Sequence, residues 1–83
     1  MTTRLTPEEA LALLAEAFNE PANELHAGRL RDSIAGWDSM GALLVIAELD
    51  ERFGIELSAD ESRRMLRVGD FLDFMRKHGL LQE

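Results

Sequence analysis

The 83-residue chain contains no cysteine, no tyrosine, one tryptophan and only two prolines. Without cysteine it can form no disulfide, bind no metal through thiolates and perform no thiol chemistry. It has no apolar run long enough to cross a bilayer, and its first residues, MTTRLTPEEA, lack the apolar core of a signal peptide. We therefore expect a cytoplasmic protein.

Basic side chains are also scarce, with nine against sixteen acidic ones and a formal net charge of −7. This charge disfavours binding to phosphate backbones and to anionic membranes, and it favours basic protein partners. The composition is that of a soluble globular protein. A chain of this length supports one domain, expected over 1–83, and has little room for an internal active-site cavity.

The segment 7–18 has the apolar spacing of an amphipathic helix. Thr6 is expected to be its N-cap and Glu9 the partner in a capping box, with Pro7 as the first helical residue. The inward stripe is predicted to be Leu11, Leu14 and Phe18. A long loop, 19–37, should follow, with one short helical turn at most.

A second helix is predicted between Asp38, as its N-cap, and Gly54, as a left-handed C-terminal cap. The residues expected to face inward are Leu43, Val45, Ile46, Leu49 and Phe53. A different strip of the same helix consists of Met40, Leu44, Glu48 and Glu51. This strip begins apolar beside Ser39 and ends acidic.

Two more helices complete the prediction. Ser58 and Glu61 form a capping-box pattern that opens a short helix at about 59–66. A last helix is expected at about 69–78, with an inward stripe of Val68, Phe71, Leu72 and Met75. With no credible strand pair, the chain should be all-α, a small antiparallel bundle of three main helices plus one short helix.

The sequence does not support an enzyme. WDSMG is similar to the G-x-S-x-G nucleophile elbow, but that motif needs a strand before the serine and a large sheet. The two histidines, His26 and His78, are expected at the surface. Neither a calcium-binding loop nor a glycine-rich phosphate loop is present.

Ser39 opens the predicted second helix, and two interpretations are open. In the first it is an ordinary helix-capping residue. In the second it carries a phosphate ester, which the free N–H groups and the positive end of the helix would stabilise.

The stretches GWDSM, ELDERFGIELS and RVGDFLDFM, in this order and spacing, resemble the acyl carrier protein family, which includes the peptidyl and D-alanyl carrier proteins. The resemblance covers nearly the whole chain. It implies that a phosphopantetheinyl transferase esterifies Ser39 with 4′-phosphopantetheine from coenzyme A, Asp38 being the family's preceding aspartate. The thiol of that arm would carry an acyl or aminoacyl group as a thioester. A carrier of this kind catalyses nothing itself.

The resemblance also implies a partner surface on the second helix. Its candidate residues here are Met40, Leu44, Glu48 and Glu51. Gly41 and Leu44 stand where fatty-acid carriers usually have acids. Leu44 could be a core residue; if it is exposed, it indicates a dedicated partner. The partners implied are the transferase, an acyl or aminoacyl ligase or transferase, and other enzymes of fatty acid, polyketide or other specialised biosynthesis. We expect a monomer.

Several points stay open at this stage. The alternative function is a non-catalytic acidic helical interaction module, an inhibitor or adaptor without cofactor, in which Ser39 is only a cap. The cargo is not identified, and Ile46, Leu49 and Leu66 are candidate liners if the bundle shelters it. The candidates for a solvated basic face are Arg63, Arg64 and Arg67.

Overall fold

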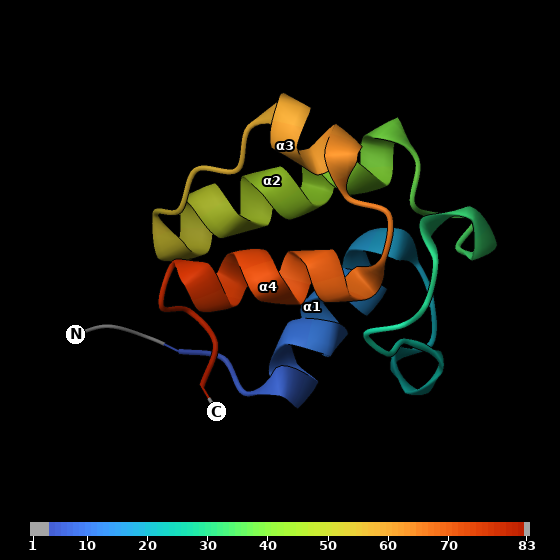
Figure 1. Ribbon diagram of the computed structural model, residues 1–83, viewed down its shortest axis with the longest axis horizontal. Coiled ribbons are helices and arrows are strands. Elements are labelled where there is room, and N and C mark those ends of the chain that lie inside the picture. Colours follow the sequence, from blue (N-terminus) through green and yellow to red (C-terminus); the bar gives the residue numbers. More distant parts are fainter. Residues whose placement is uncertain (1–3, 83) are drawn as a thin grey trace.

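The computed structural model describes residues 4–82, which form four α-helices and two short 3₁₀ turns (Figure 1). In chain order they are α1 (Pro7–Phe18), η1 (Ala22–Glu24), η2 (Arg31–Ser33), α2 (Ser39–Phe53), α3 (Ala59–Arg64) and α4 (Val68–Lys77). Over these residues the only β-type pairings are two isolated bridges. The predicted all-α bundle of three main helices and one short helix is therefore confirmed.

α1 has the predicted bounds and the predicted capping box. The Thr6 hydroxyl accepts a hydrogen bond from the Glu9 N–H at 3.1 Å, and the Glu9 carboxylate accepts one from the Thr6 N–H at 2.8 Å. Asn19 ends the helix in the left-handed conformation. Leu14 and Phe18 are buried as expected, while Leu11 is half-buried against the core.

α2 also begins and ends as predicted, but its buried face is turned from the one expected. Its buried residues are Gly41, Val45 and Leu49, spaced four residues apart. Leu43, predicted to face inward, is 56% exposed. Val45 and Leu49 are buried as predicted, and Ile46 and Phe53 are half-buried against the core. The prediction was wrong for Leu43 because it counted only apolar side chains, whereas this helix packs closely through the side-chain-free position 41.

α3 ends at Arg64, two residues before the predicted end. Met65 is buried beyond it, whereas Leu66, a candidate liner if the bundle shelters cargo, is 64% exposed. The chain is extended at Met65 because it must turn towards α4.

α4 carries the predicted stripe fully inside: Val68, Phe71, Leu72 and Met75 are all buried. Asp70 fixes the start of this helix, accepting hydrogen bonds from the N–H groups of Leu66 at 2.8 Å and Arg67 at 3.1 Å. Burial alone would raise the pKa of the Asp70 carboxyl, but these bonds and the Arg67 guanidinium outweigh it and hold the pKa below its ordinary value.

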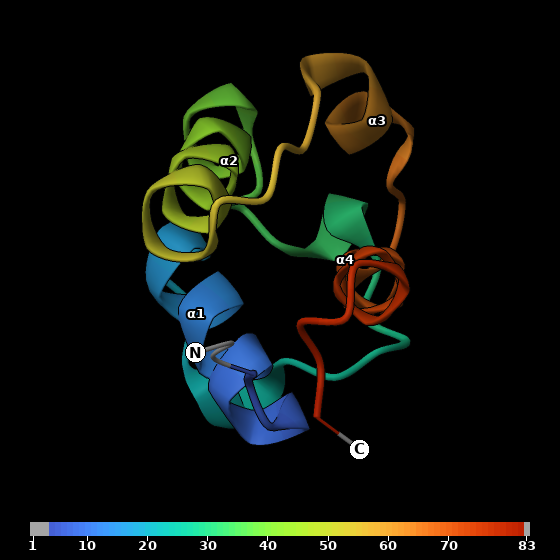
Figure 2. The same cartoon turned by 90° about the vertical axis from the view of Figure 1, so that its left-hand side faces the viewer.

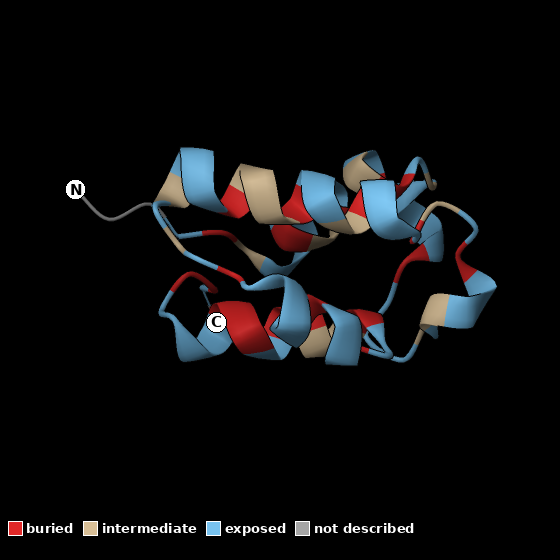
Figure 3. Cartoon of the chain, turned by 90° about the horizontal axis from the view of Figure 1, so that it is seen from above, coloured by how far each residue is buried: buried red, intermediate tan, exposed pale blue. Residues whose placement is uncertain are grey.

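The core lies between α1, α2 and α4, with α3 covering one side of the space between α2 and α4 (Figure 2). Figure 3 shows the buried residues on the helix sides that face one another. α4 runs in the same direction as α2, because α3 and its connectors bring the chain back before α4 begins (Figure 1).

The two ends of the described chain are joined. The Leu5 N–H donates to the Leu80 carbonyl at 2.7 Å, and the Gln82 N–H donates to the Leu5 carbonyl at 2.6 Å. Leu5, Leu80 and Leu81 are buried in the core cluster. The paired ends lie on the side of the molecule opposite to the start of α2 (Figure 1).

Candidate functional site

Ser39 is the first residue of α2 and is exposed. The cap of this helix is Asp38, whose carboxylate accepts a hydrogen bond from the Gly41 N–H at 2.9 Å. Among residues 4–82, the Ser39 hydroxyl has no hydrogen-bonding partner. Asp38 therefore caps the helix, and Ser39 is left exposed at the start of the helix.

The loop before Ser39 is pressed against the end of α1 at backbone level. A Cβ added at Gly36 would stand 1.7 Å from the Phe18 carbonyl oxygen, and one added at Gly41 would stand 2.1 Å from the Gly36 carbonyl oxygen. Neither glycine has a positive φ, so close approach and not backbone conformation requires them. These two contacts fix where α2 begins and therefore where Ser39 lies.

Trp37 holds the same loop against α1 and α4. Its ring stacks on Phe18 with centroids 5.1 Å apart and packs at a tilt on Phe71 at 5.0 Å, so it joins α1, the loop and α4. It is 4% exposed, and its Nε1–H is buried without a hydrogen-bond partner. Trp37 therefore holds the loop by packing, with one unsatisfied donor among residues 4–82.

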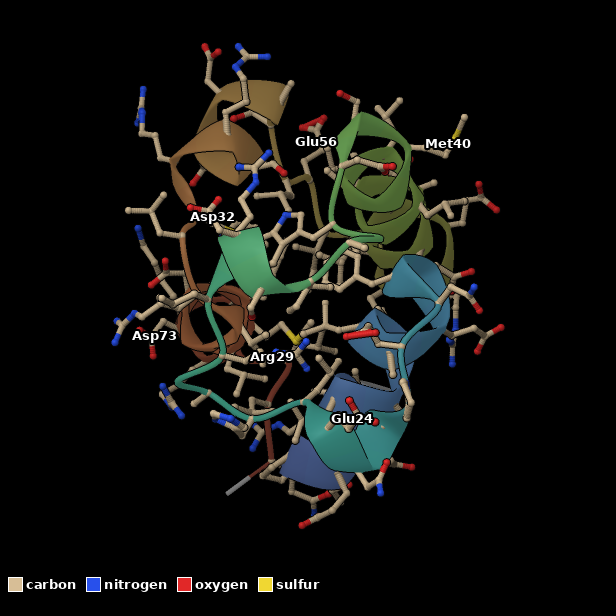
Figure 4. All side chains as sticks on the ribbon, turned by 90° about the vertical axis from the view of Figure 1, so that its right-hand side faces the viewer. Glu24, Arg29, Asp32, Met40, Glu56 and Asp73 are labelled. Carbon is tan, nitrogen blue, oxygen red and sulfur yellow. The ribbon has the colours of Figure 1, made fainter. Side chains whose placement is uncertain are left out.

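A hollow of about 290 Å³ opens beside Ser39, between α2, α3 and η2. Its lining combines Ser39 with Arg31, Ala42, Leu43, Ile46, Ala59, Ser62 and Arg63. A second hollow, of about 490 Å³, shares Leu43 and Ile46 with the first and reaches Asp50, Glu56 and Leu57. Both hollows lie along α2 and are open to solvent. Figure 4 looks along α2 from the serine end and shows Glu56 between α2 and α3.

The four residues expected to meet partners all lie at the surface of α2. None of them lines the hollow beside Ser39. Met40 is 66% exposed and Leu44 is 46% exposed, so Leu44 is not a core residue. Glu48 is half-buried and forms an ion pair with Arg52 at 3.2 Å, and Glu51 is exposed. Met40 projects away from the molecule at the serine end (Figure 4). Gly41 is buried and does not belong to this surface.

Two arginines beside Ser39 were not foreseen as site residues. Arg31 and Arg63 line the same hollow as the serine, although they are 32 residues apart in the chain. Arg63 was expected on a solvated basic face or in a partner contact, and nothing in the local spacing marks Arg31. Leu43 was assigned to the core, yet it lines both hollows.

Other kinds of site find no support among residues 4–82. No group of three or more histidine, cysteine, aspartate or glutamate residues is arranged to hold a metal ion. No described helix is long and apolar enough to span a bilayer. His26 and His78 are exposed, as predicted.

The fold and the geometry define a class of protein: a small all-α bundle that presents a serine on its surface at the start of its second main helix. Curated proteins named acyl carrier protein are similar to it over most of its length. That of Acidothermus cellulolyticus is 29% identical over 75 residues, covering 86% of this chain and 89% of the relative. Those of Helicobacter pylori strain G27 and Helicobacter acinonychis strain Sheeba are 28% and 29% identical, each covering 88% of this chain and 94% of the relative.

No family model matches the chain. The similarities to curated relatives nevertheless support the family that the residues around Ser39 had indicated. The chain is similar to acyl carrier proteins over most of its length.

Proposed function

We propose that this protein carries acyl or aminoacyl groups as thioesters on a 4′-phosphopantetheine arm esterified to Ser39. The arm would supply the thiol that the chain itself lacks. The residues of this chain would supply the attachment point, its exposure and the surface that enzymes recognise. Holding the cargo covalently raises its effective concentration at each enzyme in turn.

The observation that carries the proposal is the division of labour between Asp38 and Ser39. Asp38 satisfies the Gly41 N–H as the helix cap, so Ser39 is not needed for capping. The serine is exposed at a helix start, where an attached phosphate would meet free N–H groups and the positive end of a 15-residue helix. This arrangement favours the carrier over the interaction module, in which the serine would be only a cap.

We propose that partner enzymes dock on the strip formed by Met40, Leu44, Glu48 and Glu51. The strip starts with two exposed apolar side chains next to the serine and continues into acidic ones. Apolar contact beside the serine and charge attraction further along would orient an enzyme with a partly basic docking patch. We propose that the partner enzymes belong to fatty acid, polyketide or other specialised biosynthesis.

The decisive experiment is intact-protein mass spectrometry after incubation with coenzyme A, magnesium and a broad-specificity phosphopantetheinyl transferase. We expect the parent chain to gain the mass of one phosphopantetheine group. Ser39→Ala should gain nothing while keeping the helical circular dichroism of the parent, because Asp38 still caps α2.

Ser33→Ala is the matched control, since Ser33 is also an exposed serine near the hollow-forming turn η2. It should be modified like the parent. A folded parent that gains no mass, or a Ser39→Ala variant that still gains it, would overturn the proposal. The first of these results would favour the interaction module.

A further inference from the structure

Two guanidinium groups flank the hollow in which Ser39 lies. Arg31 belongs to η2 in the loop, and Arg63 belongs to the last turn of α3. Both line the hollow together with Ser39, and none of the acidic side chains among residues 4–82 lines it. The chain has a net charge of −7, yet two cationic side chains lie beside the candidate attachment point.

Arg31 is held in place by its surroundings. Its Nη1 donates to the backbone oxygens of Arg63 at 3.2 Å and Met65 at 3.4 Å, and its guanidinium lies 5.6 Å from the centre of the Trp37 ring. The group is therefore oriented before any ligand arrives. Of its five N–H donors, only those on Nη1 have partners among residues 4–82, so others can bind an anion.

Arg63 is less fixed. Its one ionic partner is Asp60, one turn earlier on α3, and both side chains are largely exposed, at 68% and 69%. An exposed pair of this kind contributes little to stability, so Arg63 can exchange Asp60 for a stronger anion at small cost. Arginine can bind two phosphate oxygens at once through two parallel hydrogen bonds. We expect this interaction to be stronger than the exposed ion pair with Asp60.

We propose that Arg31 and Arg63 together hold the phosphate of the arm on Ser39. The inference rests on the proposed function, because it concerns a phosphate esterified to Ser39. The nearby Asp38 carboxylate repels a phosphate, and the two arginines offset that repulsion. Leu43 and Ile46, which line the same hollow, are apolar and suit the uncharged part of the arm.

The test compares the apo chain with the phosphopantetheine-bearing chain by ¹⁵N NMR of the arginine Nε–H groups, after mass spectrometry has shown complete modification. We expect the Arg31 and Arg63 signals to shift and to exchange more slowly with solvent once the arm is attached. Arg64 and Arg67 are exposed neighbours that do not line the hollow, and they serve as internal controls.

A pair of variants extends the test. Arg63→Gln should be modified as fully as the parent but should lose part of the gain in melting temperature that the arm gives at low salt. Arg64→Gln, the same change one residue along, should retain that gain. Equal shifts at all four arginines, or equal melting behaviour of the two variants, would overturn the inference while leaving Ser39 as the attachment site. No mass gain in the parent would overturn both.

Discussion

The Cα of Gly41 lies so near the Gly36 carbonyl that a methyl group placed on it would also come within 3.0 Å of the Phe18 ring. A contact of 2.1 Å with a backbone oxygen cannot be relieved by turning a side chain. The two glycines therefore set the distance between α2 and the end of α1, and with it the position of Ser39.

We predict that Gly41→Ala lowers the free energy of unfolding by about 1 to 3 kcal/mol, the usual cost of overpacking. The gain in helix propensity from glycine to alanine, about 1 kcal/mol, will not compensate. Urea denaturation followed by circular dichroism measures this difference.

Gly28→Ala is the control for that experiment. A Cβ at Gly28 would meet only the His26 side chain at an ordinary 3.5 Å. Its stability should change by less than about 0.5 kcal/mol, as for most surface substitutions. If the two variants were equally stable, the close approach at position 41 would have no energetic weight.

At the level of elements, the start of α4 depends on one carboxylate. Asp70 accepts from two backbone N–H groups, and its pKa is held below the ordinary value. A carboxyl whose pKa is lower in the folded than in the unfolded chain stabilises the fold at pH values above the unfolded pKa. That stabilisation disappears as the pH falls through the folded pKa.

We predict that Asp70→Asn costs about 1 kcal/mol of unfolding free energy at pH 7, a typical value for a lost cap. The difference from the parent should shrink as the pH is lowered below about 4, near the ordinary pKa of aspartate. Urea denaturation at several pH values would show this. Asp73→Asn, on the exposed side of α4, should show no comparable pH-dependent loss. A gap between Asp70→Asn and the parent that stayed constant down to pH 2 would contradict the assignment.

The helices differ in how well their ends and buried faces could be predicted from the sequence. The capping box of α1 and the buried stripe of α4 were predicted, because capping boxes and apolar spacing are local signals. The cap that Asp70 provides for α4 was not predicted. The face of α2 was misjudged at Leu43, because its burial depends on a backbone contact between Gly36 and Gly41 that hydrophobic spacing does not record. The pairing of Arg31 with the end of α3 joins residues 32 apart and depends on how the bundle closes. The attachment role of Ser39 rests on the resemblance, and the structure adds only that the residue is free to take it.

For the whole molecule, the exposed apolar start of the α2 strip bears on which enzymes can dock. We predict that Leu44→Ser lowers kcat/KM of the phosphopantetheinyl transferase about fivefold, the effect of losing one apolar contact worth about 1 kcal/mol. The thermal stability should change little, because Leu44 is 46% exposed.

Leu30→Ser provides the comparison, since Leu30 is 55% exposed but lies in the loop before η2 and outside the strip. It should leave kcat/KM unchanged. Equal loss of transferase activity in both variants would mean that general surface hydrophobicity, and not the α2 strip, governs recognition.

The bridge between Leu5 and Leu81 has a consequence for how the protein can be joined to others. Because residues 5 and 81 meet on the side away from the start of α2, chain that continues from the described residues would leave the bundle on that side (Figure 1). In a chain of several such domains, the linkers would then lie on the side of each domain opposite to its serine. The same geometry makes the ends suitable for surface immobilisation, with the serine left open to enzymes in solution.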